Sequence, residues 1–392
     1  MAEAVDVVVV GGGIIGCACA REVARRGARV VVVERAELAA GASGRNHGLL
    51  LSPSEPALVS MARATLAAYH EAAAEAEIPF ALDREPIGYL IVAGEDEAER
   101  REGRTEAEAA AACGVTIEAV DRKGLRALEA ALAPDLAEGW LLDDGRRVDP
   151  AALTLALAEA ARRDGAHVRH HVAARALVSD GDRVTGVLTD DGRIDAGTVV
   201  LAAGPWSNAL LRPVGLHLPV VPARGWLVQV APREPLLARI VERAGWHLLP
   251  GEEGMEPLTA GAVSASTVEP EVGTLLHPTT DGNLLAGGSR QLTAGQEPDD
   301  HHVPGEIVRR AIVVLPGLAH ASVVSAWWGI RPMTRDGRPI VGTLRPGLVA
   351  AAGHGSQGVI LGGGTGALVG SIVAGEDPPF DPAPFSPDRF AG

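Results

Sequence analysis

The stretch VDVVVVGGGIIG, residues 5–16, decides the fold of this chain. Residues 5–10 (VDVVVV) are a run dominated by β-branched valine, which is typical of a strand buried on both faces of a parallel sheet. Glycines interrupt this run, and residues 14–26 then have the pattern of a helix that ends at Gly27. A second buried strand follows at 29–33. The stretch therefore predicts a complete βαβ unit of about thirty residues.

The turn of this unit carries three glycines with the spacing Gly11-x-Gly13-x-x-Gly16. Such glycines allow a tight bend, close approach of backbone to a pyrophosphate, and close packing of helix on strand. The helix N-terminus adds free N–H groups and a positive dipole end, which favour an anion. Glu34 follows the second strand and is placed to accept hydrogen bonds from ribose hydroxyls. The pattern predicts a site for FAD or NAD, and the Glu34 charge disfavours the 2′-phosphate of NADP.

The composition is typical of a globular protein with a large core. The chain has 392 residues, 47% of them apolar and 22% charged, so we expect two or three domains and no global disorder. Its net charge of −15 opposes sequence-independent binding to nucleic acid or anionic lipid. Three cysteines are too few for a disulfide framework. We recognise no leader segment and no membrane span, and we expect a cytoplasmic protein.

The rest of the chain alternates between α/β and β-rich stretches. Asp149 and Pro150 mark the N-cap and the first turn of one helix. Residues 218–315 are rich in strands and turns, with Asp281-Gly282 at one hairpin. Further helices are predicted at 56–77, 95–108, 151–163 and 363–374, and further strands at 175–179, 183–189, 193–195, 198–203 and 347–352. This order indicates a nucleotide-binding α/β domain made of discontinuous pieces and interrupted by a β-rich domain.

Four further segments carry a family resemblance. They read GASGRNHG at 41–48, TVVLAAGPWS at 198–207, GIRPMTRDGRPIVG at 329–342, and AGHG at 352–355 with further glycines up to Gly366. In this order they resemble the flavoproteins of the glycine oxidase, sarcosine oxidase and D-amino-acid oxidase family. The 41–48 segment is also similar to the branch that holds proline dehydrogenases and cyanide-forming glycine dehydrogenases.

The resemblance implies an α/β fold, α+β overall. It consists of a Rossmann-like FAD-binding domain of the glutathione-reductase type and an antiparallel β-rich substrate domain. The FAD-binding domain is expected at 1–82, 146–217 and 320–392, and the substrate-binding domain at 83–145 and 218–319.

The resemblance also implies FAD as a non-covalent cofactor. The cysteine that holds FAD covalently in monomeric sarcosine oxidases corresponds to Gly329, and no cysteine follows Cys113. The glycine-rich segment 353–366 is expected to be a loop before a helix whose N-terminus faces the flavin and stabilises its reduced form. The expected cofactor contacts are Gly11, Gly13, Ile14, Ile15, Gly16, Glu34, Arg35, Ser43, Gly44, Arg45, Asn46, His47, Gly48, Leu49, Val172, Ala203, Gly204, Trp206, Gly329, Arg331, Gly353, His354, Gly355, Ser356, Gln357 and Gly358.

Three residues are expected to act on the substrate: Arg331, His47 and His277. A guanidinium is a planar fork that matches a carboxylate, and the family places its substrate-binding arginine at the position of Arg331. A structural ion pair is the alternative role for this arginine. A carboxylate held there would direct the substrate Cα–H toward flavin N5, so positioning would supply most of the rate. His47 either lies near the reactive face of the flavin or supports residues that do.

The chain departs from the family in two respects. Family oxidases add a tyrosine hydroxyl near the substrate carboxylate, but only Tyr69 and Tyr89 exist here, and the matching strand reads LLHP at 275–278. Which residue makes the second contact with the carboxylate therefore stays undecided. The candidates are His277, Trp246, His247 and Gln357. Sarcosine oxidases also use a lysine to activate oxygen, whereas the single lysine, Lys123, is remote in sequence from every motif.

The remaining candidates are weaker. His170-His171 and His301-His302 have no cysteine or carboxylate at ligand spacing, so we interpret them as surface residues and expect no metal site. Cys17 and Cys19 point apart on one helix. Trp327-Trp328 either line the substrate pocket or fill the junction between domains.

Three functions follow from these observations. The first is an FAD-dependent oxidase acting on the C–N bond of a small amine or amino acid (sarcosine, glycine or a D-amino acid), with hydride transfer to flavin N5 and with O₂ as acceptor. Its products would be an imine, then an oxo acid or aldehyde, and H₂O₂. The second is a proline/glycine dehydrogenase-like subunit that passes electrons to a partner or quinone. The third is a flavin-binding protein without turnover. The specific substrate, the stereopreference and the oligomeric state stay open.

Overall fold

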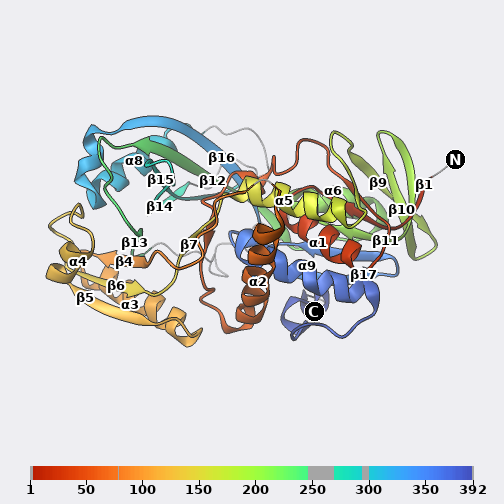
Figure 1. Ribbon diagram of the computed structural model, residues 1–392, viewed down its shortest axis with the longest axis horizontal. Coiled ribbons are helices and arrows are strands. Elements are labelled where there is room, and N and C mark those ends of the chain that lie inside the picture. The colour runs from red at the N-terminus through yellow and green to blue at the C-terminus, as the bar shows by residue number, and fades with distance from the viewer. Residues whose placement is uncertain (1–2, 78, 246–268, 294–299, 391–392) are drawn as a thin grey trace.

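The computed structural model describes residues 3–77, 79–245, 269–293 and 300–390. These residues build two large sheets of eight strands each, which lie in two lobes side by side (Figure 1). The long strands β12 and β16 run from one lobe toward the other, and helix α2 lies between the lobes in this view. Within the described residues, no helix is both long and apolar enough to cross a bilayer.

The first sheet contains the predicted βαβ unit. Its main strand order is β17-β18-β11-β1-β2-β8, and the hairpin β9-β10 extends β11. The pairs β18-β11, β11-β1, β1-β2 and β2-β8 are parallel. The bounds are β1 Glu3–Val10, β2 Val30–Val33, β8 His167–Arg169, β9 Ala174–Asp180, β10 Arg183–Thr189, β11 Gly192–Leu201, β17 Ile340–Arg345 and β18 Leu348–Ala352.

Both faces of this sheet are covered, which explains the unbroken valine run in β1. Val7 and Val9 pack with helices on one face, whereas Val8 and Val10 pack with the β9-β10 hairpin and α6 on the other. The helices of this lobe are α1 Ile14–Arg25, α2 Val59–Glu75, α5 Pro150–Arg163, α6 Ser207–Leu211 and α9 Gly358–Ala374. As predicted, Asp149 caps α5 by accepting a hydrogen bond from the Ala152 N–H (2.9 Å).

Helix α9 corrects the expectation of a glycine loop at 353–366. The helix begins at Gly358, so most of these glycines are helical. A Cβ on Gly364 would lie 2.3 Å from the Met61 carbonyl oxygen in α2, and one on Gly366 would lie 2.6 Å from the Ala18 carbonyl oxygen in α1. These glycines therefore allow α9 to pack closely against two helices, and tertiary packing overrides their low helix propensity.

The second sheet has the order β16-β12-β15-β14-β13-β4-β6-β5 and is antiparallel except for the parallel pair β13-β4. Its strands are β4 Tyr89–Ala93, β5 Ile117–Asp121, β6 Glu138–Leu142, β12 Val220–Ala231, β13 Ile240–Arg243, β14 Glu271–Pro278, β15 Leu284–Leu292 and β16 Ser322–Thr334. Its helices are α3 Glu97–Ala112, α4 Arg122–Leu128 and α8 Val303–Val314. Helix α8 packs on one face with Leu276 and Ala286. Leu275 faces the opposite side and packs near Leu49 of the other lobe.

Several predicted elements need correction. The separate strands expected at 193–195 and 198–203 are one strand, β11. Helix α8 lies inside 218–315, the region expected to be rich in strands and turns, and was not predicted. The helix expected at 95–108 runs from Glu97 to Ala112.

The domain boundaries stay a prediction. By hydrogen bonding, β16 belongs to the second sheet, although its residues fall in the range 320–392 that the sequence assigns to the FAD-binding domain. A short sheet pairs β3 (Leu49–Leu50) with β7 (Arg146–Arg147). It therefore joins the predicted FAD-binding segments 1–82 and 146–217.

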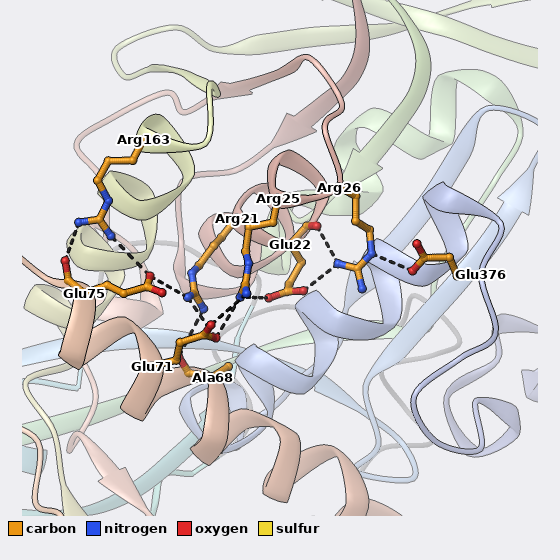
Figure 2. A network of polar contacts seen from close by, with 9 residues as sticks. All are labelled: Arg21, Glu22, Arg25, Arg26, Ala68, Glu71, Glu75, Arg163 and Glu376. Atoms are coloured by element: carbon orange, nitrogen blue, oxygen red, sulfur yellow. Dashed lines mark hydrogen bonds and ion pairs between the residues drawn. The ribbon is translucent and has the colours of Figure 1, made fainter.

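A network of ion pairs joins the helices of the first lobe (Figure 2). Arg21 of α1 is buried and contacts Glu71 (3.2 Å) and Glu75 (3.0 Å) of α2. Arg26 pairs with Glu376, just after α9 (3.0 Å). Since α1 is joined to α2 and to the end of α9, the βαβ unit that carries the glycine turn is held firmly in the lobe.

Candidate active site

The glycine turn between β1 and α1 has no room for side chains. A Cβ on Gly16 would lie 1.9 Å from the Gly11 carbonyl oxygen, and one on Gly11 would lie 2.3 Å from the Ala202 carbonyl oxygen. Gly11 also has a φ of +116°, a conformation that side chains disfavour. These contacts match the close helix–strand packing that the spacing predicts, with Ile14 and Ile15 forming the first turn of α1.

Two side chains close this turn. The Glu34 carboxylate accepts hydrogen bonds from the N–H groups of Gly12 (2.7 Å) and Ala36 (2.9 Å). The Ser43 hydroxyl accepts one from the Ile14 N–H at the N-terminus of α1 (2.8 Å). Each carboxylate oxygen can accept a second hydrogen bond, so Glu34 keeps capacity for a ribose hydroxyl.

The segments predicted for the adenosine end lie together. The Arg35 guanidinium lies 3.8 Å above the centre of the Trp206 ring. The Val172 N–H donates to the Glu34 carbonyl oxygen (2.8 Å). Ala203 and Gly204 follow β11, next to the glycine turn.

The loop 43–49 connects the two lobes. Asn46 donates to the carbonyl oxygens of Ala42 and Ser43 and accepts from the Gly48 N–H (2.7 Å), which fixes a tight turn. Arg45 donates to the Trp328 carbonyl oxygen of β16 (3.2 Å). Gly44 and Leu49 lie within the same segment, and Gly329 lies under Arg45, where a Cβ would be 3.2 Å from that of Arg45. The loop thus brings His47 onto the second sheet.

His47, which is half-buried, and His277, which is buried, form a pair whose ring centres are 5.3 Å apart. Both His47 ring nitrogens and the Nε2 atom of His277 have no hydrogen-bond partner. The His277 Nδ1 atom lies 3.2 Å from the Pro278 carbonyl oxygen, so this nitrogen carries the proton and Nε2 has the free lone pair. Burial lowers the pKa of His277 to about 4 and holds that of His47 well below its usual range. Both rings are therefore neutral at neutral pH.

Arg331 lies half-buried beside this pair. Its Nη1 atom donates to the Ser289 carbonyl oxygen (2.9 Å), and a Cβ on Gly225 would lie 2.1 Å from Nη1. Burial, together with the charge of Arg290, lowers the pKa of Arg331 to about 10, so it stays protonated at neutral pH. Among the described residues, no carboxylate pairs with Arg331, which leaves a half-buried cation next to His47 of the neutral pair.

Arg290 is a neighbour of this site that the sequence analysis missed. Arg331 pairs in register with Ala223, and Ala223 pairs with Leu292. Paired residues share a face of the sheet, as do residues two apart on a strand, so Arg290 lies on the same face as Arg331. Its Nε atom donates to Glu271 (3.0 Å).

Two glycines on this face also escaped the sequence analysis. Gly287 lies under His47, where a Cβ would be 2.3 Å from Nε2, just as Gly225 lies under Arg331. Glycines within the run LLAGGSRQL at 284–292 could have indicated such a close approach.

Other predicted residues lie apart from the cluster or outside the described chain. His354 is buried and bonds Thr365 inside the lobe (2.9 Å). Gly353 and Gly355 contact Thr334 and Met333. Ser356 and Gln357 lead into α9, which begins at Gly358. Trp246 and His247 lie outside the described residues. Of the tryptophan pair, Trp328 packs with the α8 core, whereas the Trp327 Nε1 atom is buried without a partner.

This set of groups fits FAD. The turn has the glycine spacing that allows a pyrophosphate to lie at the N-terminus of α1, and Glu34 retains acceptor capacity at the end of β2. Away from this turn, the side chains of His47, His277 and Trp327 have nitrogens without a partner in the described chain. His47 lies in the loop 43–49, whereas His277 and Trp327 lie on β14 and β16 of the second sheet. Buried polar atoms are normally paired, so these atoms suit a polar ligand at this place.

The chain belongs to the FAD-dependent oxidoreductases: the DAO family model, described as FAD dependent oxidoreductase, matches residues 6–372. Glycine oxidase of Geobacillus kaustophilus is 31% identical over 405 residues, covering 100% of this chain and 99% of the relative. The crystal structure of glycine oxidase from the same species matches with a TM-score of 0.85 at 28% identity, over 100% of both chains. A D-amino acid dehydrogenase of Bradyrhizobium diazoefficiens is 28% identical over 282 residues, covering 71% of this chain and 61% of its own.

These matches confirm the predicted family, the α/β fold with its Rossmann-like FAD-binding part, and FAD as the cofactor. They leave the individual site residues and the non-covalent attachment as predictions.

Proposed function

We propose that this chain oxidises the C–N bond of a small amino acid or amine, such as glycine, sarcosine or a D-amino acid, and uses O₂ as acceptor. The observation that carries the proposal is a half-buried Arg331, without a carboxylate partner in the described chain, beside the neutral pair His47 and His277. A cation next to neutral hydrogen-bond acceptors complements the carboxylate and the amine of an amino acid. The glycine oxidase relative supports this substrate class.

Arg331 would bind the substrate carboxylate. A buried guanidinium without an anion is costly, whereas a bidentate pair with a carboxylate compensates its charge. The hydrogen bond to Ser289 fixes its orientation. Arg290 lies on the same face and adds positive charge, while Glu271 at the edge of the sheet offsets part of it.

The histidine pair would receive the amine. The Nε2 lone pair of His277 can accept a hydrogen bond from the substrate nitrogen, and the neutral state of both rings avoids repulsion of an ammonium group. When bound, FAD supplies the acceptor for the hydride that leaves the substrate Cα. Arg331 and His277 would then define the direction of the Cα–H bond, so most of the rate would come from positioning. Water would convert the imine to an oxo acid or aldehyde.

Transfer of electrons to a partner or quinone is the second candidate. Lys123 is exposed on α4, which packs on β5 and β6 at the far edge of the second sheet, so it does not reach Arg331 or the histidines. A lysine that activates oxygen is therefore not offered by the described chain. The D-amino acid dehydrogenase relative also supports this alternative.

An anaerobic absorption spectrum of the purified holoenzyme tests both candidates. Glycine, sarcosine, proline and D-amino acids are added one at a time, and oxygen is then admitted. An oxidase bleaches with one substrate and recolours rapidly in air with release of H₂O₂. Bleaching without rapid recolouring favours the dehydrogenase, and the absence of bleaching with every substrate contradicts the proposal.

A further inference from the structure

Glu37, His170 and His171 form a cluster of possible metal ligands at the end of the first sheet. The His170 Nδ1 atom lies 3.2 Å from Glu37 Oε2, and the His171 Nε2 atom lies 2.8 Å from Oε1. One ligand atom from each residue lies within 4.8 Å of the others. The sequence analysis expected these histidines to have no carboxylate partner, because Glu37 is 134 positions before His171 in the chain.

The backbone holds the three residues in place. The N–H of Glu34 donates to the Arg169 carbonyl oxygen (2.9 Å), and the N–H of His171 donates to that of Ala36 (3.2 Å). A third bond joins Val172 to Glu34 (2.8 Å). These bonds clamp the segment after β2 to the segment after β8, so the cluster is part of a paired structure and not of two independent loops.

The backbone at His171 explains why two adjacent side chains turn to one carboxylate. Neighbouring side chains in an extended segment point to opposite sides. His171 instead has a φ of +60°, a left-handed conformation that few residues other than glycine adopt. The two imidazoles consequently lie with ring centres 4.9 Å apart. A strained non-glycine residue of this kind points to a function that requires its conformation.

The donor set matches a first-row divalent metal ion. Two imidazoles and one carboxylate bind Zn²⁺ in sites that keep a further position open, with bonds of about 2.0–2.2 Å. Tetrahedral bonds of this length place ligand atoms about 3.3 Å apart. The separations of 3.2 and 2.8 Å join the histidines to different oxygens of Glu37, and one ligand atom of each residue lies within 4.8 Å of the others. Side-chain rotations would bring these atoms to the spacing of a metal site, and all three residues are exposed to solvent.

We propose that Glu37, His170 and His171 bind a divalent transition-metal ion of the Zn²⁺ type, with water completing the coordination. The ion would join the segment 34–37 to the segment 169–172. Ala39, two residues after Glu37, donates to the Gly12 carbonyl oxygen in the glycine turn (3.1 Å). Metal binding would thus stabilise the wall next to the expected adenosine end of FAD, and it does not depend on which substrate the enzyme oxidises.

Calorimetric titration of the untagged, metal-free holoenzyme with Zn²⁺ tests this site. We expect one ion per chain and a higher melting temperature with Zn²⁺. The variant Glu37→Gln should bind at least a hundredfold more weakly, because even changes behind metal ligands cost about 10- to 100-fold, and the double variant His170→Gln/His171→Gln should lose the site.

The chain provides a matched control. His301 and His302 are also adjacent and exposed, but no carboxylate in the described residues pairs with them. The double variant His301→Gln/His302→Gln should therefore bind Zn²⁺ like the wild type. Absence of Zn²⁺ binding by the wild type, equal affinity of wild type and Glu37→Gln, or loss of binding in the control variant would each overturn the proposal.

Discussion

Arg331 is the residue whose replacement most directly tests the proposed function. Its guanidinium is half-buried and has no carboxylate partner in the described chain, so a substrate carboxylate would be its natural counter-ion. We expect Arg331→Leu to weaken substrate binding by about 2–4 kcal/mol, which is a rise in KM of roughly 30- to 1,000-fold. Arg331→Lys should recover only part of this loss, because an ammonium group lacks the planar fork.

Arg243 offers a control for this prediction. It lies on β13 of the same sheet but is paired with Glu99 (2.7 Å), away from the histidine pair. Arg243→Leu should leave KM near the wild-type value. An unchanged KM in Arg331→Leu would remove Arg331 from the substrate site.

Gly287 tests the position of His47. A Cβ here would lie 2.3 Å from His47 Nε2 and 2.4 Å from a methyl carbon of Leu227, so Gly287→Ala must displace the imidazole. A displacement of about 1 Å at a reacting group costs roughly 100-fold in rate. We expect kcat to fall by that order while FAD stays bound, as measured by steady-state kinetics and by the flavin spectrum. Wild-type kcat in a folded Gly287→Ala enzyme would show that His47 does not position the substrate.

At the scale of elements, α9 depends on close packing against α2. Gly364→Ala would gain about 1 kcal/mol of helix propensity, but its Cβ would lie 2.3 Å from the Met61 carbonyl oxygen. Overpacking of this kind costs about 1–3 kcal/mol, and a backbone atom has little freedom to move away. We therefore expect a net loss of stability in urea unfolding. Gly305→Ala in α8, with no atom within 4 Å of its Cβ, should be neutral or stabilising instead.

The same helices show which parts of the fold the sequence could predict. β1, α1 and β2 follow from local pattern, because a valine run and a glycine turn depend on few distant residues. The start of α9 does not: its glycines have the composition of a loop, and only contact with Met61 and Ala18 makes them helical. β11 was divided because its first half alternates exposed and buried residues where it pairs with β10, whereas its last three residues are all buried.

In the candidate site, too, some residues could be predicted from the sequence and others could not. Arg331, His47 and His277 come from three distant segments that the sequence analysis named separately, and the structure brings them together. Arg290, Gly225 and Gly287 depend on strand register, and the pairing of Glu37 with the histidines depends on contact between β2 and β8. Neither is encoded in local spacing, so these groups could be found only in three dimensions.

For the whole molecule, buried histidines and buried carboxylates act on stability in opposite directions as pH changes. Burial lowers the pKa of His277 to about 4 and that of His354 to about 3, below the unfolded value of about 6.5. Below pH 6.5 the unfolded chain therefore binds more protons than the native one. The free energy of unfolding that the two neutral histidines contribute is lost as the pH falls toward their native pKa values. Burial raises the pKa of Glu242 to about 8 and that of Glu106 to about 7, so their contributions are lost as pH rises from about 4.5 toward those values.

Because these effects overlap, the difference between a variant and the wild type is the informative quantity. His277→Gln keeps a donor for the Pro278 carbonyl oxygen but does not titrate, so its destabilisation relative to wild type should shrink between pH 6.5 and 4, by about 3 kcal/mol at most. Glu242→Gln should show its change on the alkaline side, between about pH 4.5 and 8, where the wild type loses stability and the variant does not. Urea midpoints measured across this range check both. A His277→Gln difference that does not change with pH would mean that the imidazole is not buried and neutral, and His277 could then not accept the substrate amine.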